Sequence, residues 1–301
     1  MRLASFSPTH EAVPRAGLII DNDTTVVDLE AALRGELDVP GDLRALIEAG
    51  PDLLDRVREA VAGRMSWPVA TVYPLVDVRL HAPLRPGKVI GVGLNYVDHV
   101  EESSRTLDTD EELPSRPVLF SKPGTAVIGP GEPILHDARL TTQLDWECEL
   151  AVVIGRTARS VHRDDAYHHV FGYTILNDIS ARDQRRAGQW FFSKGQDSYA
   201  PLGPIVVTAD ELPDPHTLDL ALFVNGEQKQ NGNSKHMLFP IPVLIEDITS
   251  GITLAPGDII ATGSPQGVGA AQNPPQYLRP GDVVEARIQG IGALSNPVKA
   301  V

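Results

Sequence analysis

The feature that most constrains the fold of this chain is a short pattern, Leu-x-Pro-Gly-x, that ends in two β-branched residues. It occurs three times, at residues 84–90, 254–260 and 278–284. Pro-Gly suits the two central positions of a type II turn, and β-branched residues favour strands. The copies are unevenly spaced, which excludes a solenoid of equal repeats. Each copy therefore predicts a turn that leads into a strand of a sheet-rich domain.

Strand-like segments dominate the chain from residue 81 to the end. Examples are PVLFSKP, CELAVVIG, FGYTILND, PLGPIVVT, LALFVNG and DVVEARIQGIG. Helical patterns between them are few, and the 25 Pro and 26 Gly are scattered, as many turns require. We therefore predict a mainly β chain with some α structure, of the α+β class, with one β-rich domain over residues 81–301.

The first 80 residues predict a separate, small α+β domain. The segments AGLIID and TTVVDL read as two strands joined by a turn at Asp21–Asp23. The segments GDLRALIEAG and PDLLDRVREAVAG read as two helices, and Pro51 suits the first turn of the second one. No catalytic constellation is visible in residues 1–80. We expect a supporting or dimer-contact role for this part.

Charge and cysteine content narrow the class of function. The chain carries 26 Lys and Arg against 40 Asp and Glu, a net charge of −14. This balance argues against nucleic-acid binding, which needs clustered basic residues. The single cysteine, Cys148, cannot form an intrachain disulfide, and no apolar segment approaches the length of a membrane span. We expect a cytoplasmic protein that acts on a small molecule and not on a membrane.

Acidic residues alternate along one strand-like segment, LDWECELAVVIG, which contains Asp145, Glu147 and Glu149. Alternate residues of a strand share a face and lie about 6–7 Å apart. Towards the end of the segment the same face becomes apolar, so the carboxylates are expected to be partly buried. Buried like charges must be protonated or neutralised by a cation, and oxygen ligands suit Mg²⁺, Mn²⁺ or Ca²⁺. Spacing alone leaves a cation site and a solvated acidic edge both open.

A third carboxylate, Asp178, stands at the end of the apolar segment GYTILND, where a short helix is expected to begin. Ser180 and Asp183 have the spacing of a capping box. Arg182 would return to the neighbourhood of Asp178 after one helical turn. A plain turn or cap residue is the alternative interpretation of Asp178.

The motif GLNYVDHVEE supplies a candidate base. His99 and Glu102 are three residues apart and would share one face of a helix. A carboxylate beside a histidine raises its basicity and fixes its orientation, which suits activation of water. The same spacing also occurs in simple surface pairs. Lys194, in the loop FSKGQDSYAPLGP, is placed to meet an anion.

Taken together, these segments resemble the fumarylacetoacetate hydrolase family. They occur in the family's order over roughly residues 80–298 and are VGLNYVDHVEE, LDWECELAVVIGR, GYTILNDISARD, FSKGQDSYAPLGP, LFVNGEQKQNGNSKHMLF and LAPGDIIATGSPQGVG. The resemblance implies a mixed β-sandwich roll as the catalytic fold, usually in a homodimer. The N-terminal domain resembles the short extra domain of many bacterial-type members.

The resemblance also implies roles for site residues. It makes Glu147, Glu149 and Asp178 the ligands of one Mg²⁺ or Mn²⁺ per chain, with Ca²⁺ possible. Asp145, outside the Glu-x-Glu pair, is expected to lie behind the ligands or at the surface. The implied catalytic residues are His99 and Glu102, on a lid segment, and Lys194.

The residues that the resemblance places at the substrate are Tyr96, Arg182, Gln184, Arg185 and Thr262. One position departs from the family pattern. The family often has Gln three residues after the Arg of its Ser-Ala-Arg-Asp motif, whereas this chain has Arg185 there and Gln184 one position earlier. Either the local register or this substrate contact is changed.

The implied activity is metal-dependent hydrolysis of a C–C bond in an acylpyruvate-like or β-diketo acid. Water would be activated by the His99–Glu102 pair, and the metal would stabilise the enolate. Decarboxylation of oxaloacetate and keto–enol isomerisation of a hydroxymuconate-type acid are alternatives on the same metal site. A non-catalytic ligand-binding protein is a third interpretation. No motif in the sequence indicates which acyl group the substrate carries.

Overall fold

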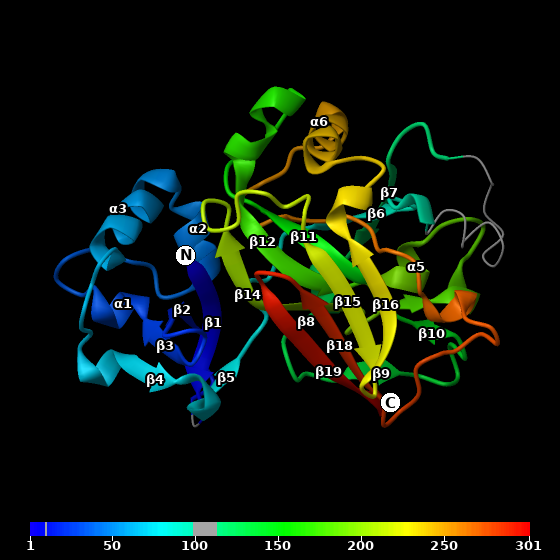
Figure 1. Ribbon diagram of the computed structural model, residues 1–301, viewed down its shortest axis with the longest axis horizontal. Helices are drawn as coiled ribbons and strands as arrows, with labels where there is room; N and C mark the ends of the chain where they lie inside the picture. The colour runs from blue at the N-terminus through cyan, green and yellow to red at the C-terminus, as the bar shows by residue number, and fades with distance from the viewer. Residues whose placement is uncertain (10, 99–112) are drawn as a thin grey trace.

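The computed structural model describes residues 1–9, 11–98 and 113–301. Two β-sheets pack against each other to form the larger part of the molecule (Figure 1). A smaller N-terminal part, blue and cyan in Figure 1, lies at one end and is joined to the larger sheet. The fold is mainly β with some α, as the sequence predicts.

The large sheet has 12 strands over the described residues. They are β1 (Arg2–Pro8), β2 (Arg15–Ile20), β3 (Thr25–Asp28), β4 (Val72–Pro74), β5 (Val78–Leu80), β6 (Val89–Gly93), β7 (Val118–Lys122), β8 (Val127–Ile128), β11 (Cys148–Ile154), β12 (Val170–Asn177), β14 (Ala200–Thr208) and β17 (Ile259–Ala261). Their order is β4-β3-β2-β1-β14-β12-β11-β17-β6-β7, with β5 beside β1 and β8 beside β14. The central strands β11, β12 and β14 are almost entirely buried.

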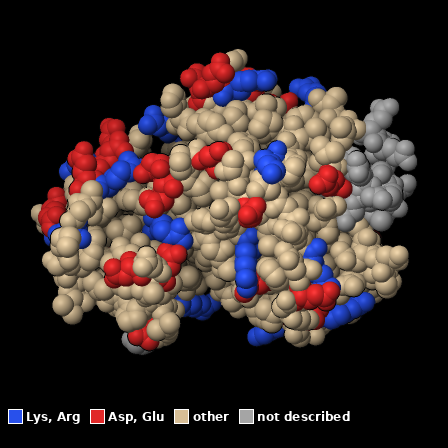
Figure 2. Space-filling view, viewed as in Figure 1, with Lys and Arg blue, Asp and Glu red and all other residues tan. Residues whose placement is uncertain are grey.

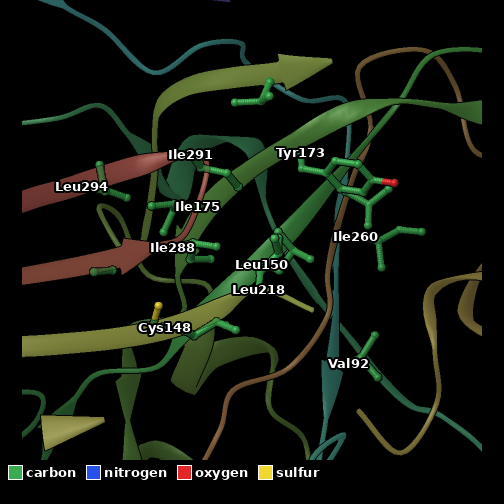
Figure 3. Close-up of a cluster of buried hydrophobic side chains, with 14 of the residues drawn as sticks. Val92, Cys148, Leu150, Tyr173, Ile175, Leu218, Ile260, Ile288, Ile291 and Leu294 are labelled. Atoms are coloured by element: carbon green, nitrogen blue, oxygen red, sulfur yellow. The ribbon is translucent and has the colours of Figure 1, made fainter. Parts of the chain in front are cut away.

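The second sheet covers one face of these central strands. Its order is β16-β15-β18-β19-β9, formed by β9 (Ile134–His136), β15 (Asp219–Val224), β16 (Glu227–Asn233), β18 (Val283–Ile288) and β19 (Gly292–Ala300). Contacts of β11, β12 and β14 with β15, β18 and β19 make the sandwich. Figure 3 shows part of the core between the sheets, where Leu150 and Ile175 lie near Ile288. A separate two-stranded ladder joins β10 (Leu144–Asp145) to β13 (Ser180–Ala181).

Helices are short and peripheral. The α-helices are α1 (Leu29–Ala32), α2 (Leu43–Glu48), α3 (Pro51–Val61), α5 (Phe191–Lys194) and α6 (Ile241–Gly251). The 3₁₀ turns span Val69–Thr71, Leu75–Asp77, Gly124–Ala126, Arg163–His169, Arg182–Gln184, Ser234–His236 and Gly269–Ala271. In the part of the chain that the structure describes, no helix has the length and apolar character needed to cross a membrane.

The N-terminal elements follow the sequence prediction closely. The two predicted strands are β2 and β3, the two predicted helices are α2 and α3, and Pro51 begins α3. The turn at Asp21–Asp23 has three successive positive φ angles, 53°, 54° and 64°, which Asp and Asn tolerate better than most residues. Strand β1 was not predicted; it pairs with β14 and extends the large sheet into this part. The division into two domains at residue 80 stays a prediction.

The three Leu-x-Pro-Gly segments each lead into a strand, as predicted. The strands are β6, β17 and β18. Gly257 and Gly281 have φ angles of +81° and +100°, the left-handed conformation that the third residue of a type II turn requires. Gly87 does not have a positive φ, so the first segment reaches its strand through a different turn.

Basic and acidic side chains are interspersed on the face of the molecule that Figure 2 shows, with many of the acidic ones on the N-terminal part. Many ion pairs on the described surface join partners that are at least partly exposed, such as Arg44 with Glu48 and Arg58 with Asp55. Exposed pairs of this kind contribute little to stability, typically below about 1 kcal/mol. Stability must therefore come from the packed sheets.

Close strand packing at Gly172 gives the first prediction. A Cβ atom there would overlap the backbone carbonyl of Val207 on β14, and backbone cannot move aside as a side chain can. We expect Gly172→Ala to lower the free energy of unfolding by about 1–3 kcal/mol or more, measured by urea denaturation. Gly251→Ala is the control, because no atom lies within 4 Å of its added Cβ. Equal stability of the two variants would contradict the packing argument.

Candidate metal centre and active site

Three buried carboxylates meet where β11 begins and β12 ends. Glu147 directly precedes β11, Glu149 lies within it, and Asp178 directly follows β12. The two strands are antiparallel and pair Cys148 with Asn177, which brings Asp178 beside Glu147. The Asp178 N–H donates to the Glu147 carbonyl at 2.8 Å. One ligand oxygen from each of the three residues lies within 4.8 Å of the others.

These carboxylates are the three residues that the sequence predicts as metal ligands. Their exposed fractions are 5% for Glu147, 1% for Glu149 and 0% for Asp178. The alternative interpretation as a solvated acidic edge is therefore wrong. The alternation along β11 is as predicted: Cys148 and Leu150 face the core between the sheets, while Ala151 and Val153 belong to the second apolar cluster.

Asp145 does not belong to the same face, because residues 144–155 do not form one continuous strand. The segment breaks between β10 and β11, and each part pairs with different partners. The Asp145 carboxylate is fully buried and accepts hydrogen bonds from the N–H groups of Trp146, Gly269 and Ala270. It also accepts one from Arg182 Nε at 2.8 Å. The expected position behind the ligands is confirmed, and the surface alternative is wrong.

The predicted helix after Asp178 is also wrong. Residues 180–181 form β13, which pairs with β10, and a 3₁₀ turn starts only at Arg182. Ser180 and Asp183 do not form a capping box: Ser180 Oγ donates to the Asp178 carbonyl, while Asp183 accepts from Thr141 and Thr142. Residues 180 and 181 cannot be helical here, because their backbone is extended and pairs with that of Leu144 and Asp145 in β10.

Arg182 is nevertheless brought into the site by that ladder. Its Nε contacts Asp145, and its second guanidinium nitrogen donates to Glu147 Oε1 at 2.7 Å. The pKa of Arg182 is raised: burial opposes the charge, but the attraction of Asp145 and Glu147 outweighs it. Arg182 thus connects the buried Asp145 to a predicted metal ligand and stays charged.

Lys194, at the end of α5, points directly into the carboxylate cluster. Its ammonium lies 2.9 Å from Glu147 Oε2, 2.6 Å from Asp178 Oδ2 and 2.9 Å from Ser180 Oγ. Burial lowers the pKa of this side chain, but Asp178 and Glu147 more than compensate, so the pKa is raised overall. The Lys194 ammonium therefore keeps its proton at neutral pH.

A second buried lysine, Lys122, lies at the end of β7 and was not predicted from the sequence. Its side chain is completely buried, and its ammonium lies 2.6 Å from Asp178 Oδ1. It also donates to the carbonyls of Ile179, Tyr199 and Lys194. Burial lowers the pKa of Lys122, and the attraction of Asp178 offsets this lowering only in part. The signal in the sequence was a lysine at the end of an apolar strand, directly before a proline, in PVLFSKP.

Among the residues that the structure describes, the buried charges in this cluster do not balance. Four carboxylates, Asp145, Glu147, Glu149 and Asp178, face three cations, Lys122, Arg182 and Lys194. Glu149 accepts a hydrogen bond from the Gly263 N–H at 3.0 Å but has no cationic side chain within ion-pair distance among the described residues. Burial, Asp178 and Glu147 raise its pKa well above the ordinary value. A bound cation would replace that proton.

Asp178 Oδ1 offers a further test of whether a divalent cation fits here. The oxygen is buried and 2.6 Å from Lys122 Nζ, yet the contact lacks hydrogen-bond geometry. An ammonium has three protons, and those of Lys122 are directed to three carbonyls. We therefore regard this contact as an ion pair that leaves an oxygen lone pair open. All-oxygen donors and an uncompensated negative charge suit Mg²⁺, Mn²⁺ or Ca²⁺.

The cluster forms one wall of a pocket. Its described lining residues are Val92, Gly93, Leu94, Glu147, Glu149, Ser180, Ala181, Arg182, Arg185, Trp190, Ser193, Lys194 and Ser264. Five of them are predicted site residues: Glu147, Glu149, Arg182, Arg185 and Lys194. Trp190 and Ser264 were not predicted, because their positions carry no motif that marks a pocket.

Three of the residues predicted at the substrate do not line this pocket in the described structure. Gln184 donates to the Leu140 carbonyl, and the Thr262 hydroxyl donates to the Leu150 carbonyl at 2.8 Å. Tyr96 is 1% exposed, and its pKa is raised by burial and then by Glu149 and Cys148. Substrate contacts of these three residues stay predictions. The predicted pair His99 and Glu102 lies outside the described residues.

Comparison with known proteins identifies the family. The family model described as "Fumarylacetoacetate (FAA) hydrolase C-terminal" matches residues 88–299, well over half of the chain. The chain belongs to the fumarylacetoacetate hydrolase family. Among curated relatives, oxaloacetate tautomerase YisK of Bacillus subtilis (strain 168) is 41% identical over 291 residues, which cover 94% of this chain and 95% of that protein.

Solved structures of the fumarylacetoacetate hydrolase family have the same fold. The fumarylacetoacetate hydrolase from psychrophilic Exiguobacterium antarcticum superposes with a TM-score of 0.81 at 36% identity, covering 100% of both chains. Maleylpyruvate hydrolase from Sphingobium sp. SYK-6, solved in complex with manganese(II) and pyruvate, gives a TM-score of 0.79 at 32% identity, covering 100% of this chain and 99% of that one. The predicted family and fold class are confirmed.

Metal addition should stabilise this family member through Glu149. We expect Mn²⁺ at a hundredfold excess over its Kd to stabilise the wild-type chain by about 3 kcal/mol. Glu149→Gln should be more stable than wild type in EDTA, because folding no longer has to bury a carboxyl group that must first take up a proton, and should gain little from Mn²⁺. Thermal unfolding with EDTA or MnCl₂ measures both effects. Glu59→Gln, at an exposed position, is the control. Equal Mn²⁺ stabilisation of Glu149→Gln and wild type would contradict the metal assignment.

Loss of the Lys122 ammonium should be costly. Lys122→Met leaves Asp178 without one of its cations and removes a donor from three buried carbonyls. Removing one partner of a buried ion pair costs about 3–5 kcal/mol. We expect a loss of this size in urea denaturation, whereas Lys299→Met, at an exposed position, should stay close to wild type. A loss of stability below about 1 kcal/mol for Lys122→Met would contradict this, because it would show that the Lys122–Asp178 ion pair does not stabilise the fold.

Proposed function

We propose that this chain is a divalent-metal-dependent keto–enol tautomerase of a small 2-oxo acid, with oxaloacetate as the first substrate to test. The observation that carries the proposal is the buried carboxylate triad with the Lys194 ammonium 2.6 Å and 2.9 Å from two of its members. The similarity to an oxaloacetate tautomerase over nearly the full chain supports the choice of reaction.

The reaction needs stabilisation of an enolate and little else. A proton leaves the carbon next to the carbonyl, the C–C double bond forms, and the former carbonyl oxygen takes a proton. No bond between heavy atoms breaks, and nothing is oxidised or reduced. A divalent cation held by Glu147, Glu149 and Asp178 would supply Lewis-acid stabilisation of the negative charge on the 2-oxo acid oxygens.

The chain's own residues supply the remaining electrostatics. Lys194 retains its proton at Nζ and lies in the pocket wall, so its positive charge can stabilise the oxygen on which negative charge develops. Ser180 and the two carboxylates fix the ammonium in place by hydrogen bonds. Arg182, held by Asp145, orients Glu147 from the other side. The cluster is therefore organised before substrate binds.

Hydrolysis of a C–C bond in an acylpyruvate-like acid is the second candidate. It is supported by the similarity to maleylpyruvate hydrolase, whose structure holds manganese(II) and pyruvate. It would pass through the same enolate but also needs an activated water, for which His99 and Glu102 stay the predicted pair. Decarboxylation of oxaloacetate would use the enolate without water. The three reactions differ in their products.

A product assay distinguishes these reactions. Freshly dissolved oxaloacetate and a small acylpyruvate panel would be followed by enol absorbance, together with pyruvate and CO₂, using Mg²⁺, Mn²⁺ or EDTA. We expect metal-dependent acceleration of the oxaloacetate keto–enol equilibrium without matching release of pyruvate. Glu149→Gln should lose this activity. Pyruvate with CO₂ from oxaloacetate would instead show a decarboxylase, and pyruvate with an acid from an acylpyruvate would show a hydrolase.

A further inference from the structure

The space for two aromatic rings beside Lys194 comes from two glycines of β6. Gly91 and Gly93 are two residues apart in this strand, so both face the same side of the large sheet. A Cβ atom on Gly91 would overlap the ring of Phe120, and one on Gly93 would overlap the ring of Trp190. Both rings therefore lie directly on the backbone of β6, where a side chain on either glycine would displace them.

The two rings support each other and come from different elements. Phe120 lies on β7 and pairs with Gly91 across the two strands, while Trp190 directly precedes α5. Their centroids are 5.5 Å apart at an interplanar angle of 56°, a tilted arrangement that aromatic pairs favour. The Trp190 carbonyl accepts hydrogen bonds from the Lys194 N–H at 2.9 Å and from the Ser193 hydroxyl at 3.0 Å. The rings are thus fixed relative to the short helix that carries Lys194.

The Lys194 ammonium contacts these rings as well as the carboxylates. Its Nζ lies over the Phe120 ring, 4.8 Å from the centroid, and lies 6.0 Å from the centroid of the Trp190 ring. A cation within about 6 Å of a ring centroid is attracted by the negative charge of the ring face, and more strongly where water is excluded. Lys194 is only 5% exposed. Its contact with Phe120 is therefore a cation–π interaction at a nearly dry site.

The rings hold the ammonium without using an oxygen atom of the site. Lys194 donates to Glu147 and Asp178, which are two of the three predicted metal ligands. With a divalent cation bound, the ammonium would share these oxygens with it, and the two positive charges would repel each other. Phe120 is neutral, and its attraction for the ammonium does not draw on those oxygens. The ring contact thus keeps Lys194 in place under the condition in which its carboxylate contacts weaken.

We propose that Phe120 is a positioning residue: its ring, supported by Trp190, holds the Lys194 ammonium at the pocket wall while a divalent cation occupies the carboxylate triad. Strand β7 then fixes both the side chain and the main chain of Lys194, because Lys122 donates to its carbonyl. The inference rests on the proposed function for the part that Lys194 plays in the reaction, whereas the contact itself does not depend on it. It also explains the Gly-Val-Gly sequence of β6, since only glycine leaves room for both rings.

The test replaces Phe120 site-specifically by mono-, di- and trifluorinated phenylalanine. Each fluorine withdraws electron density from the ring face and so weakens its attraction for a cation, while the shape of the side chain hardly changes. The matched control is the same series at Phe223 on β15, whose ring has the Arg287 guanidinium carbon 4.6 Å from its centroid and is not among the described residues that line the pocket. Each protein is assayed for Mn²⁺-dependent tautomerisation of oxaloacetate and for thermal unfolding.

We expect kcat to fall with each fluorine added to Phe120 and to be about 3- to 30-fold lower for the trifluorinated ring. The KM for oxaloacetate should change less, because Lys194 acts on charge that develops during the reaction. The Phe223 series should keep the kcat of wild type, and all proteins should unfold at similar temperatures. A kcat that does not follow the number of fluorines on Phe120, or equal falls in both series, would overturn the proposal, because a ring that only fills space shows no electronic trend.

A measurement of geometry complements the rate assay. Lysine labelled with carbon-13 at its ε carbon is followed by NMR in protein saturated with Mg²⁺, and Lys194→Arg identifies the Lys194 signal by its loss. We expect this signal to lie outside the range of exposed lysines such as Lys299, because the ring current of Phe120 shifts it, and to move towards that range in Phe120→Leu. An ordinary Lys194 signal in wild type, or one that Phe120→Leu leaves unchanged, would overturn the proposal.

Failure of the proposed function gives a different pattern. If wild type does not accelerate the tautomerisation of oxaloacetate but its Lys194 signal is shifted and responds to Phe120→Leu, the tautomerase proposal falls and the positioning of Lys194 by Phe120 stands. If wild type is active and neither kcat nor the Lys194 signal responds to changes at Phe120, the tautomerase proposal stands and the positioning role falls.

Discussion

The uncompensated negative charge buried around Asp178 is the constraint on which the rest of the site depends. Carboxylates this deeply buried cannot all be ionised in isolation, because desolvation disfavours each charge and the charges repel one another. The chain meets this with two lysines and an arginine that contact three of the four carboxylates. Glu149 is left as the carboxylate that needs either a proton or a cation. Among the described residues, the buried ion pairs thus leave Glu149 as the carboxylate whose charge a bound cation would compensate.

The β-sandwich makes this concentration of charge possible. Glu149 and its neighbours lie on strands whose other face is fixed in the apolar core between the sheets. The register of β11 against β12 sets the separation of Glu147 and Asp178, and the ladder of β10 with β13 delivers Arg182. Lys122 ties β7 to the segments that follow β12 and α5 through their carbonyls. The site is therefore part of the packed structure, which limits how far its ligands can move.

The same arrangement explains why one centre can serve several reactions of the fumarylacetoacetate hydrolase family. Stabilised enolates are shared by tautomerisation, decarboxylation and C–C hydrolysis, and under the proposed function the triad with Lys194 would stabilise that shared species. Selection among the reactions must come from groups further out in the pocket.

The sequence by itself determined the strand-rich fold class, the turns before β6, β17 and β18, and the three candidate ligands. Alternation along a strand and Pro-Gly turns are local rules, so residues close in the chain are enough to reveal them. The tertiary structure alone decided the break between β10 and β11, the extended path after Asp178 and the role of Lys122. Each of these depends on pairing or burial between residues far apart in sequence, such as Lys122 with Asp178 or Asp145 with Gly269. Local patterns contain no information about such partners, because the cost of burying a charge is set by whatever the fold places beside it.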